Sequence, residues 1–496
     1  MRRAAWCRTL IAIAAVTLVM PATATAPPKE KTGSLTQVGH EPLMSRGMNS
    51  AGAIHGDYVY IGSRTDGGHE GMPHGGIMIV DVSDPSEPTL ITDEPIDANP
   101  GESSRELRVW ASQNILIVLN TNCGVGDELH HCTQPSISNF RFYDISGTNA
   151  TDPQLLFQFN ADTHEFFLWQ DPNNPERALI FAGNASSTCA IRGGSPSCPF
   201  SVWDISPVRN GQSPVTLFNG LHGYTRFPAF PEPVQKPTGS LHSLSVSNDG
   251  SRAYFALLTG GFAVVDVSDF AKGVPSPQPR PITLNEARPT WSGPGAHSAV
   301  KLWGRDWVWV SDEVYGTATG SGHGCPWGWA RMVDISDPRV PTVEAEYRIP
   351  ENDPSTCDDW NPPRTSYSAH NPTLTPHIAF STWHSGGFQA VSIQRAHRPY
   401  QLAEFFPQPL PEVMLEDPRL SSDPDTGRHE KVVMWSYPIV KDGLIYVIDL
   451  RNGLYVLKYR GAFEKEVSRI GFLEGNSNQG DALCYEPVGS APSYCD

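Results

Sequence analysis

The fold is decided by a short apolar stretch that reads Ile77-Met78-Ile79-Val80-Asp81. Apolar residues in an unbroken run, bounded by a turn-forming aspartate, are typical of a buried β-strand. The pattern recurs along the chain, with copies that start 58 to 68 residues apart. The copies occupy residues 77–81, 140–144, 200–204, 262–266, 330–334, 388–392 and 454–458, and the last two lack the aspartate. Seven β-rich units at nearly constant spacing indicate a solenoid or a propeller.

Each unit also carries signals for three further strands. Upstream of the apolar strand lies a pair of strands joined by a tight turn, as at Asn248-Asp249-Gly250 between 243–246 and 253–257. Downstream, several copies continue with Ser-Asp-Pro and another short strand, as at 343–347. Four antiparallel strands per unit make a propeller blade, so we predict an all-β, seven-bladed β-propeller. We expect the repeated aspartates to cap turns by accepting backbone N–H bonds, with calcium ligation as the alternative.

The chain resembles the LVIVD-repeat family, bacterial proteins that are secreted or held at the cell surface. The family is named for this strand motif followed by Asp-Val-Ser-Asp-Pro, and the copies at 77–88, 262–269 and 331–341 match it best. The resemblance implies a propeller over essentially the whole mature chain and a location outside the cytoplasm. It implies no particular activity, so the chemistry has to be inferred from individual residues.

The amino-acid composition argues against several classes of protein and of binding partner. The 496 residues carry a formal charge of −17 and include 44 glycines and 45 prolines. So many loop-forming residues exclude a coiled coil and a helical bundle. The acidic balance argues against nucleic acid and anionic membrane surfaces as partners. No apolar run of membrane-spanning length occurs, so we expect no membrane span.

The first residues have the features of a secretory signal peptide. Arginines precede an uncharged apolar run at 10–20, and Ala22-Thr23-Ala24 supplies the small residues of a peptidase site. We expect cleavage after Ala24 and a secreted or extracytoplasmic protein, at the cell surface or in the periplasm. The expected organisation is a signal peptide at 1–24, an N-terminal extension at 25–45, the propeller at 46–475 and a disulfide-tied C-terminal tail at 476–496.

Eight cysteines lie beyond the signal peptide and fall into four neighbouring pairs. An oxidising compartment favours disulfides for such a set, and we prefer nearest-neighbour pairing while other connectivities stay open. The preferred pairs are Cys123/Cys132, Cys189/Cys198, Cys325/Cys357 and Cys484/Cys495.

One face of the predicted propeller carries the long connections, which follow the second and fourth strands of each blade. Long loops on one face of a rigid scaffold are where function is expected. The first strand of each blade starts at this face, nearest the central axis. We assign these seven innermost positions to His55, Arg105 or Glu106, His164, His242, His297, His370 and Trp435.

Four consecutive blades thereby bring His164, His242, His297 and His370 toward the axis. Converging neutral imidazoles are a suitable site for copper or iron, and less so for zinc. At the level of fold alone, this is similar to propellers that hold copper or iron through axial histidines, such as methanethiol oxidases and carotenoid oxygenases. The alternative is structural, because repeat ancestry copies a hydrogen-bonding histidine into every blade.

The candidate catalytic residues are Glu313 and His384, which follow the second strands of the fifth and sixth blades. Either could act as a base, and Glu165 or Glu313 could fix the tautomer of a ligating imidazole. We predict a metal-binding oxidoreductase that acts on a small molecule, and no nucleotide cofactor because no phosphate-binding glycine motif is present. One alternative is a non-catalytic surface module that binds a protein or glycan through tryptophans, and another is a metal-free hydrolase. The candidate stacking residues are Trp291, Trp303, Trp327, Trp329 and Trp383.

Overall fold

The protein is described by a computed structural model. Its contacts divide the chain into a unit Met1–Glu30 and a unit Lys31–Asp496, and the residues described below all belong to the second unit. The described residues are 32–68, 74–122, 136–184, 190–192, 195–197, 199–224, 241–291, 295–313, 327–353, 355, 366–417, 420–421, 431–471 and 484–485.

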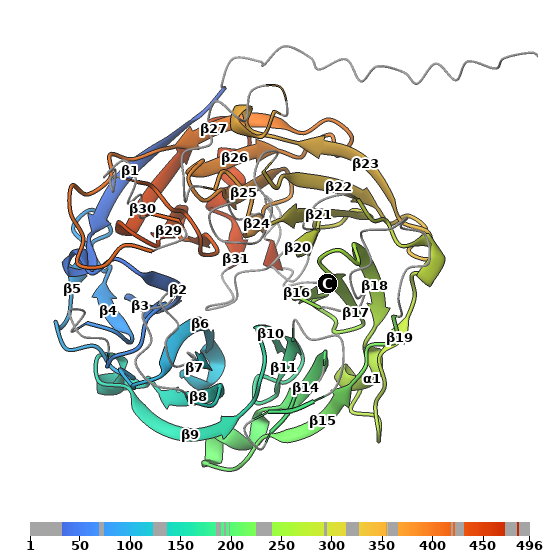
Figure 1. Ribbon diagram of the computed structural model, residues 1–496, viewed down its shortest axis with the longest axis horizontal. Coiled ribbons are helices and arrows are strands. Elements are labelled where there is room, and N and C mark those ends of the chain that lie inside the picture. The colour runs from blue at the N-terminus through green and yellow to red at the C-terminus, as the bar shows by residue number, and fades with distance from the viewer. Residues whose placement is uncertain are drawn as a thin grey trace, which may run out of the picture. The chain divides into compact units, whose positions relative to one another are not determined.

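Within these residues, seven four-stranded antiparallel sheets follow one another around a common axis (Figure 1). The strands nearest the axis are β2 (Asn49–His55), β6 (Glu102–Trp110), β10 (Glu165–Gln170), β16 (Ser243–Val246), β20 (Ala296–Lys301), β24 (Pro372–Leu374) and β28 (Ile439–Lys441). The second strands are β3 (Tyr58–Ser63), β7 (Ile115–Asn122), β11 (Ala178–Gly183), β17 (Arg252–Ala256), β21 (Trp307–Asp312), β25 (Ile378–Thr382) and β29 (Leu444–Asp449).

The third strands contain the seven copies of the sequence motif. They are β4 (Met78–Asp81), β8 (Asn139–Asp144), β14 (Phe200–Asp204), β18 (Phe262–Asp266), β22 (Ala330–Asp334), β26 (Phe388–Ser392) and β30 (Gly453–Arg460). The outer strands are β5 (Thr89–Leu90), β9 (Gln154–Asn160), β15 (Val215–Gly220), β19 (Arg280–Pro281), β23 (Thr342–Tyr347), β27 (Tyr400–Phe405) and β1 (Ser34–Glu41). The predicted seven-bladed β-propeller with four antiparallel strands per blade is confirmed.

The remaining elements are short. Among the residues that the structure describes, two helices, α1 (Ser268–Ala271) and α2 (Glu464–Val467), and six 3-10 turns lie in the connections. These turns are η1 (Leu43–Ser45), η2 (Ala111–Gln113), η3 (Gly147–Ala150), η4 (Ser206–Asn210), η5 (Asn285–Ala287) and η7 (Pro350–Asn352). Two small ladders pair β12 (Ala190–Arg192) with β13 (Ser195–Ser197) and β31 (Ile470–Gly471) with β32 (Cys484–Tyr485). No helix of the described residues is long and apolar enough to cross a membrane.

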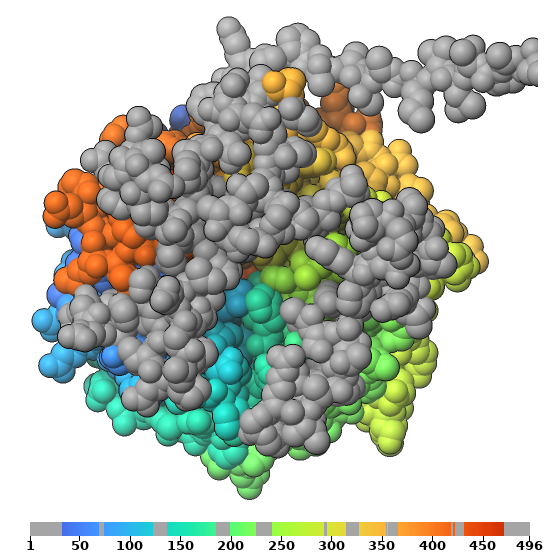
Figure 2. All heavy atoms as spheres, viewed as in Figure 1, coloured from blue at the N-terminus to red at the C-terminus, as the bar shows by residue number. Residues whose placement is uncertain are grey.

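The hydrophobic core lies between neighbouring blades. The cluster between blades two and three, for example, packs Trp110 and Phe142 against Phe166 and Trp203. Middle strands are therefore apolar on both faces, which explains their unbroken apolar runs. The outer strands are more exposed: no residue of β9 is buried, and its Leu155 is 53% exposed. In Figure 2 the chain colours change in order around the molecule, so blades that are consecutive in sequence are neighbours in space.

The repeated aspartates terminate the third strands by capping turns. In five blades the carboxylate accepts a hydrogen bond from the backbone N–H of the serine two residues later, at 2.7–2.9 Å. These pairs are Asp81–Ser83, Asp144–Ser146, Asp204–Ser206, Asp266–Ser268 and Asp334–Ser336. The predicted capping role is confirmed for these aspartates, since a side chain that satisfies the next N–H fixes a turn.

The ring closes between the two ends of the propeller sequence. Strand β1 pairs antiparallel with β30, from Ser34 opposite Arg460 to Glu41 opposite Leu454. The segment 25–45 was expected to be an extension, but its residues 34–41 form the outermost strand of blade seven. The correction has a physical reason: without β1, strand β30 would present an unpaired edge.

Several expectations fall outside the described residues. These are the signal peptide at 1–24, nearly all of the tail at 476–496, and the side chains of all eight paired cysteines. Secretion and the disulfide pairing therefore stay predictions.

Candidate metal centre

Four neighbouring blades place one histidine each at the same end of the innermost strand. His164 and His242 directly precede β10 and β16, His370 lies two residues before β24, and His297 is the second residue of β20. Successive ring centroids lie 4.3 Å apart for His164 and His242, 4.1 Å for His242 and His297, and 4.2 Å for His297 and His370. The structure thus brings the four predicted metal ligands together.

Glu313 joins this row of imidazoles from the connection that follows β21. Its Oε2 atom lies 3.4 Å from Nε2 of His297 and 3.9 Å from Nε2 of His242. Its Oε1 atom lies 3.1 Å from Nε2 of His370 and 3.9 Å from Nε2 of His384. One carboxylate therefore faces four imidazoles, two on each oxygen.

His384 comes from the tight turn after β25 and extends the row beyond His370, with ring centroids 4.9 Å apart. Its backbone φ is 39°, in the left-handed region that a residue with a side chain rarely occupies. The turn is held by mutual backbone hydrogen bonds with Met434, at 2.9 and 3.1 Å. Such strain persists only where surrounding contacts fix it, and it concentrates at functional sites.

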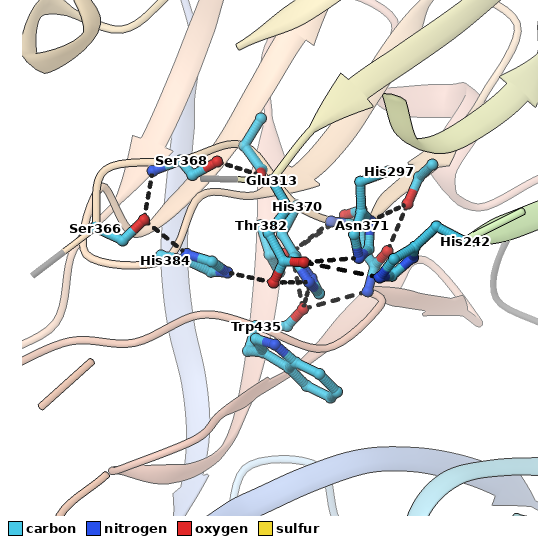
Figure 3. Close-up of polar contacts among 12 residues, drawn as sticks. His242, His297, Glu313, Ser366, Ser368, His370, Asn371, Thr382, His384 and Trp435 are labelled. Carbon is cyan, nitrogen blue, oxygen red and sulfur yellow. Dashed lines mark hydrogen bonds and ion pairs between the residues drawn. The ribbon is translucent and has the colours of Figure 1, made fainter. Parts of the chain in front are cut away.

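His370 and His297 each make a hydrogen bond through Nδ1, on the side of the ring away from Glu313. These bonds determine that the nitrogen facing Glu313, Nε2, is an acceptor. Nδ1 of His370 donates to the carbonyl oxygen of Trp435 at 2.6 Å. Nδ1 of His297 lies 2.8 Å from the hydroxyl of Ser298, which itself donates to Asn371 Oδ1 at 2.7 Å. The serine must therefore accept from His297, and Nε2 of both rings is left with its lone pair when the ring is neutral. Figure 3 shows His297, His370, Asn371 and Trp435 together with Glu313.

Burial keeps three of the imidazoles neutral. It lowers the pKa of His242 and of His384 to about 3, and the pKa of His297 well below the ordinary histidine value, with neighbouring imidazoles adding to the effect on His297. Neutral rings offer nitrogen lone pairs at ordinary pH. The cluster is thus chemically suited to bind a cation without first losing protons.

The two carboxyl groups of the cluster differ. Burial by itself raises the pKa of Glu313, but His297, His370 and His242 outweigh it and hold that pKa well below its usual range. Burial and nearby Glu106 raise the pKa of Glu165 well above its usual range. Glu165 Oε1 lies 3.5 Å from Nε2 of His297, and Tyr437 donates to its other oxygen at 3.1 Å.

His164 differs from the other three predicted ligands because a guanidinium lies against it. Nitrogens of Arg105 are 3.2 and 3.0 Å from its two ring nitrogens. Its Nε2 atom also lies 2.9 Å from Nε2 of His242. Burial and then Arg105 lower the pKa of His164 well below its ordinary value. Its lone pair is shared with an arginine, which makes it the weakest candidate ligand of the four.

The assignment of His55 to this ring is wrong. His55 ends β2 and pairs with Tyr58 beside the hairpin turn, at the opposite end of the innermost strand. At the end where β2 begins, blade one presents Asn49 and Ser50, and the Ser50 hydroxyl donates to the carbonyl oxygen of Arg105 at 2.6 Å. Trp435 does lie at the cluster, with its ring centroid 5.1 Å from that of His370.

A comparison with known protein families identifies the repeat that the strands contain. A family profile described as LVIVD repeat matches residues 47–93 and 239–272, which cover strands of blades one and four. The chain carries LVIVD repeats. Both the predicted resemblance and the propeller that it implies are therefore confirmed.

No curated protein matches this LVIVD-repeat chain significantly. Among solved structures, Sqt1 from Chaetomium thermophilum is 14% identical, with a TM-score of 0.42 and coverage of 84% of this chain and 85% of that chain. The same protein bound to the N-terminus of ribosomal protein L10 gives a TM-score of 0.41 at 14% identity, covering 84% and 89%. The computationally designed Ika8 protein gives 0.40 at 11% identity, covering 86% and 99%.

The tryptophans proposed as a stacking surface are divided between core and surface. Trp327 and Trp383 are fully buried, so they belong to the core of the LVIVD-repeat propeller. Trp291 and Trp329 are half-buried and both lie against the guanidinium of Arg331. Trp303 is half-buried as well, so three of the five tryptophans keep part of their surface exposed.

Sequence reasoning missed the residues behind the imidazoles. Ser298, Asn371 and Ser366 support the rings of His297 and His384, and the Ser366 hydroxyl lies 3.0 Å from Nδ1 of His384. Two of them directly follow a cluster histidine in sequence, as His297-Ser298 and His370-Asn371. The polar residue that follows each of these histidines could have indicated the supporting hydrogen bonds.

Proposed function

We propose that the protein binds a transition-metal ion through His242, His297, His370, His384 and Glu313. The observation that carries this is the spacing of the donor atoms. Ligands bound tetrahedrally at about 2.1 Å lie about 3.4 Å from one another. Glu313 oxygens and the four Nε2 atoms are separated by 3.1–3.9 Å, which matches donors that surround an ion.

The structural alternative for these histidines accounts less well for the contacts. A histidine that serves only to join strands should have both ring nitrogens hydrogen-bonded. Nε2 of His297 and Oε1 of Glu165 are buried and have no hydrogen-bond partner among the described residues. Buried polar atoms without partners are costly, and a bound cation removes that cost.

The donor set also limits the identity of the ion and its ligand. Imidazole nitrogens with carboxylate oxygens suit copper, iron and zinc, and copper or iron would support the proposed oxidoreductase activity. The ion would supply Lewis-acid or redox chemistry to a ligand that occupies an open coordination position. The side chains of the five donors are between 0 and 10% exposed, so the substrate we propose is a small molecule.

Metal analysis of freshly purified full-length protein tests the proposal. We expect at least one equivalent of copper, iron or zinc per chain, and a lower metal content in the His297→Gln variant. His397→Gln is the matched control, because His397 is exposed on the loop after β26, away from the cluster. Protein that contains no metal and takes up none from added copper, iron or zinc would contradict the proposal.

A further inference from the structure

Among the described residues, three sets of donor atoms lie mutually close: His164, Glu165 and His242; His242, His297 and Glu313; and Glu313, His370 and His384. Arg105 lies against His164, so the last two sets, here the first and the second group, are the better candidates, and they share only Glu313. The carboxylate oxygens are divided between them, since Oε2 faces the first pair of histidines and Oε1 the second. In Figure 3, His242 and His297 lie on one side of Glu313 and His384 lies on the other.

A single ion leaves one half of this arrangement unexplained. If an ion binds His242, His297 and Oε2, then His370 Nε2 still lies 3.1 Å from Oε1. Both atoms are buried and have no hydrogen-bond partner among the described residues. Buried polar atoms without partners are costly, and a second ion would remove that cost for this pair.

Glu165 lies beside the first group without joining it. Its Oε1 atom is 3.5 Å from Nε2 of His297 and 3.7 Å from Nδ1 of His242, whereas Nε2 of His242 is the nitrogen that faces Glu313. Each group therefore offers two imidazoles and one carboxylate, a sufficient set for a transition metal that keeps an open position for a ligand.

We propose that the centre is dinuclear, with Glu313 bridging two transition-metal ions through its two oxygens. This inference rests on the proposed function and specifies its stoichiometry. One ion would be held by His242 and His297, and the other by His370 and His384. Carboxylate-bridged ions lie about 3.5–4 Å apart and bind an oxygen-containing small ligand between them.

Zinc titration of the metal-free, full-length protein, followed by equilibrium dialysis and metal analysis, tests the inference. We expect two zinc ions per chain in the wild type and in His397→Gln. His242→Gln and His384→Gln should each retain one ion, because each removes a ligand from one group only. Glu313→Gln should retain no more than one ion, because its amide has a single acceptor oxygen.

The outcomes separate the two proposals. Wild-type protein that binds one ion, weakened by both His242→Gln and His384→Gln, would overturn the dinuclear centre and leave metal binding intact. Protein that binds no ion would overturn both. Retention of two ions in Glu313→Gln would overturn the bridge.

A spectroscopic measurement on the wild type does not depend on whether a variant folds. Two copper(II) ions bridged by a carboxylate are magnetically coupled, so the electron paramagnetic resonance of fully loaded protein should account for fewer spins than bound copper ions. A spin count equal to the copper content at full loading would contradict the bridge.

Discussion

The Nδ1 atom of His370 lies 2.6 Å from the carbonyl oxygen of Trp435, which belongs to the next blade. A backbone carbonyl can only accept, so this contact fixes the proton on Nδ1 and aims Nε2 at Glu313. The tautomer is thus set by the packing of blade six on blade seven. Neighbouring blades control the chemistry of the cluster, and the predictions below follow from such contacts.

The hydroxyl of Ser298 should control the metal affinity of His297. In Ser298→Ala, Nδ1 of His297 loses its acceptor and the ring loses its fixed tautomer. We expect the affinity for zinc to fall by about 10–100-fold, measured by competition with a chelating dye. Ser245→Ala is the matched control, since Ser245 makes a similar bond to the Ala299 carbonyl at 2.7 Å, outside the cluster. Equal affinities in the two variants would contradict the positioning role.

The stability of the metal-free protein should decrease in acid. Burial lowers the pKa of His242 and of His384 from 6.5 to about 3. Between these values the unfolded chain binds more protons than the folded chain, so the free energy of unfolding falls as the pH falls below 6.5. We expect a loss of about 1.4 kcal/mol per pH unit for each such histidine.

Urea unfolding in the presence of a chelator, at several pH values between about 7.5 and 5, measures this dependence. In His242→Gln, the slope of the free energy of unfolding against pH should decrease by the equivalent of about one proton. A free energy of unfolding that stays constant over this interval would show that these rings are not buried in the neutral form.

Because the backbone of His384 is left-handed, substitutions at this position should differ in their effect on stability. Asparagine tolerates positive φ and a β-branched residue does not, so His384→Val should unfold more easily than His384→Asn by about 1–2 kcal/mol. The same two substitutions at His242, whose φ is not positive, provide the control. Chemical denaturation of the four metal-free variants makes the comparison, and an equal Val–Asn difference at both sites would contradict the strain.

Closure of the ring should be sensitive to a methyl group at Gly39 in β1. A Cβ atom there would lie 2.2 Å from the Pro85 carbonyl oxygen and 2.7 Å from Pro88 Cδ. We expect Gly39→Ala to lower the free energy of unfolding by about 1–3 kcal/mol, because blade one has to shift. Thr36→Ala, an exposed change on the same strand, should have little effect, and thermal unfolding compares the two.

Most of the fold could be predicted because one local pattern repeats. The apolar strands and their capping aspartates are specified within ten residues each, so reading Ile77 to Pro88 was enough to recognise a blade. Strand β1 has no such signal, and its partner β30 lies more than 400 residues away in sequence. Pairing over that distance depends on the number of blades and the curvature of the ring, which no short segment encodes.

Most residues of the candidate site could be predicted from the sequence, but their arrangement in space was harder to predict. His242, His297 and His370 could be placed because each stands at the start of a strand that precedes a hairpin. His55 was misplaced although Gly56-Asp57, directly after it, marks the turn at the other end of its strand. The sharing of Glu313 between two pairs of histidines depends on the rotation between blades, which the sequence does not display.

The pairing of Ser34 with Arg460 also has a consequence for the order in which the chain folds during synthesis. On the ribosome, β1 emerges first but finds its partner only after the last blade has been translated. Residues 242–384, which contain every histidine of the dinuclear proposal, are available well before then. The proposed ions would therefore meet their histidines while the ring is still open, before β1 pairs with β30 and closes it.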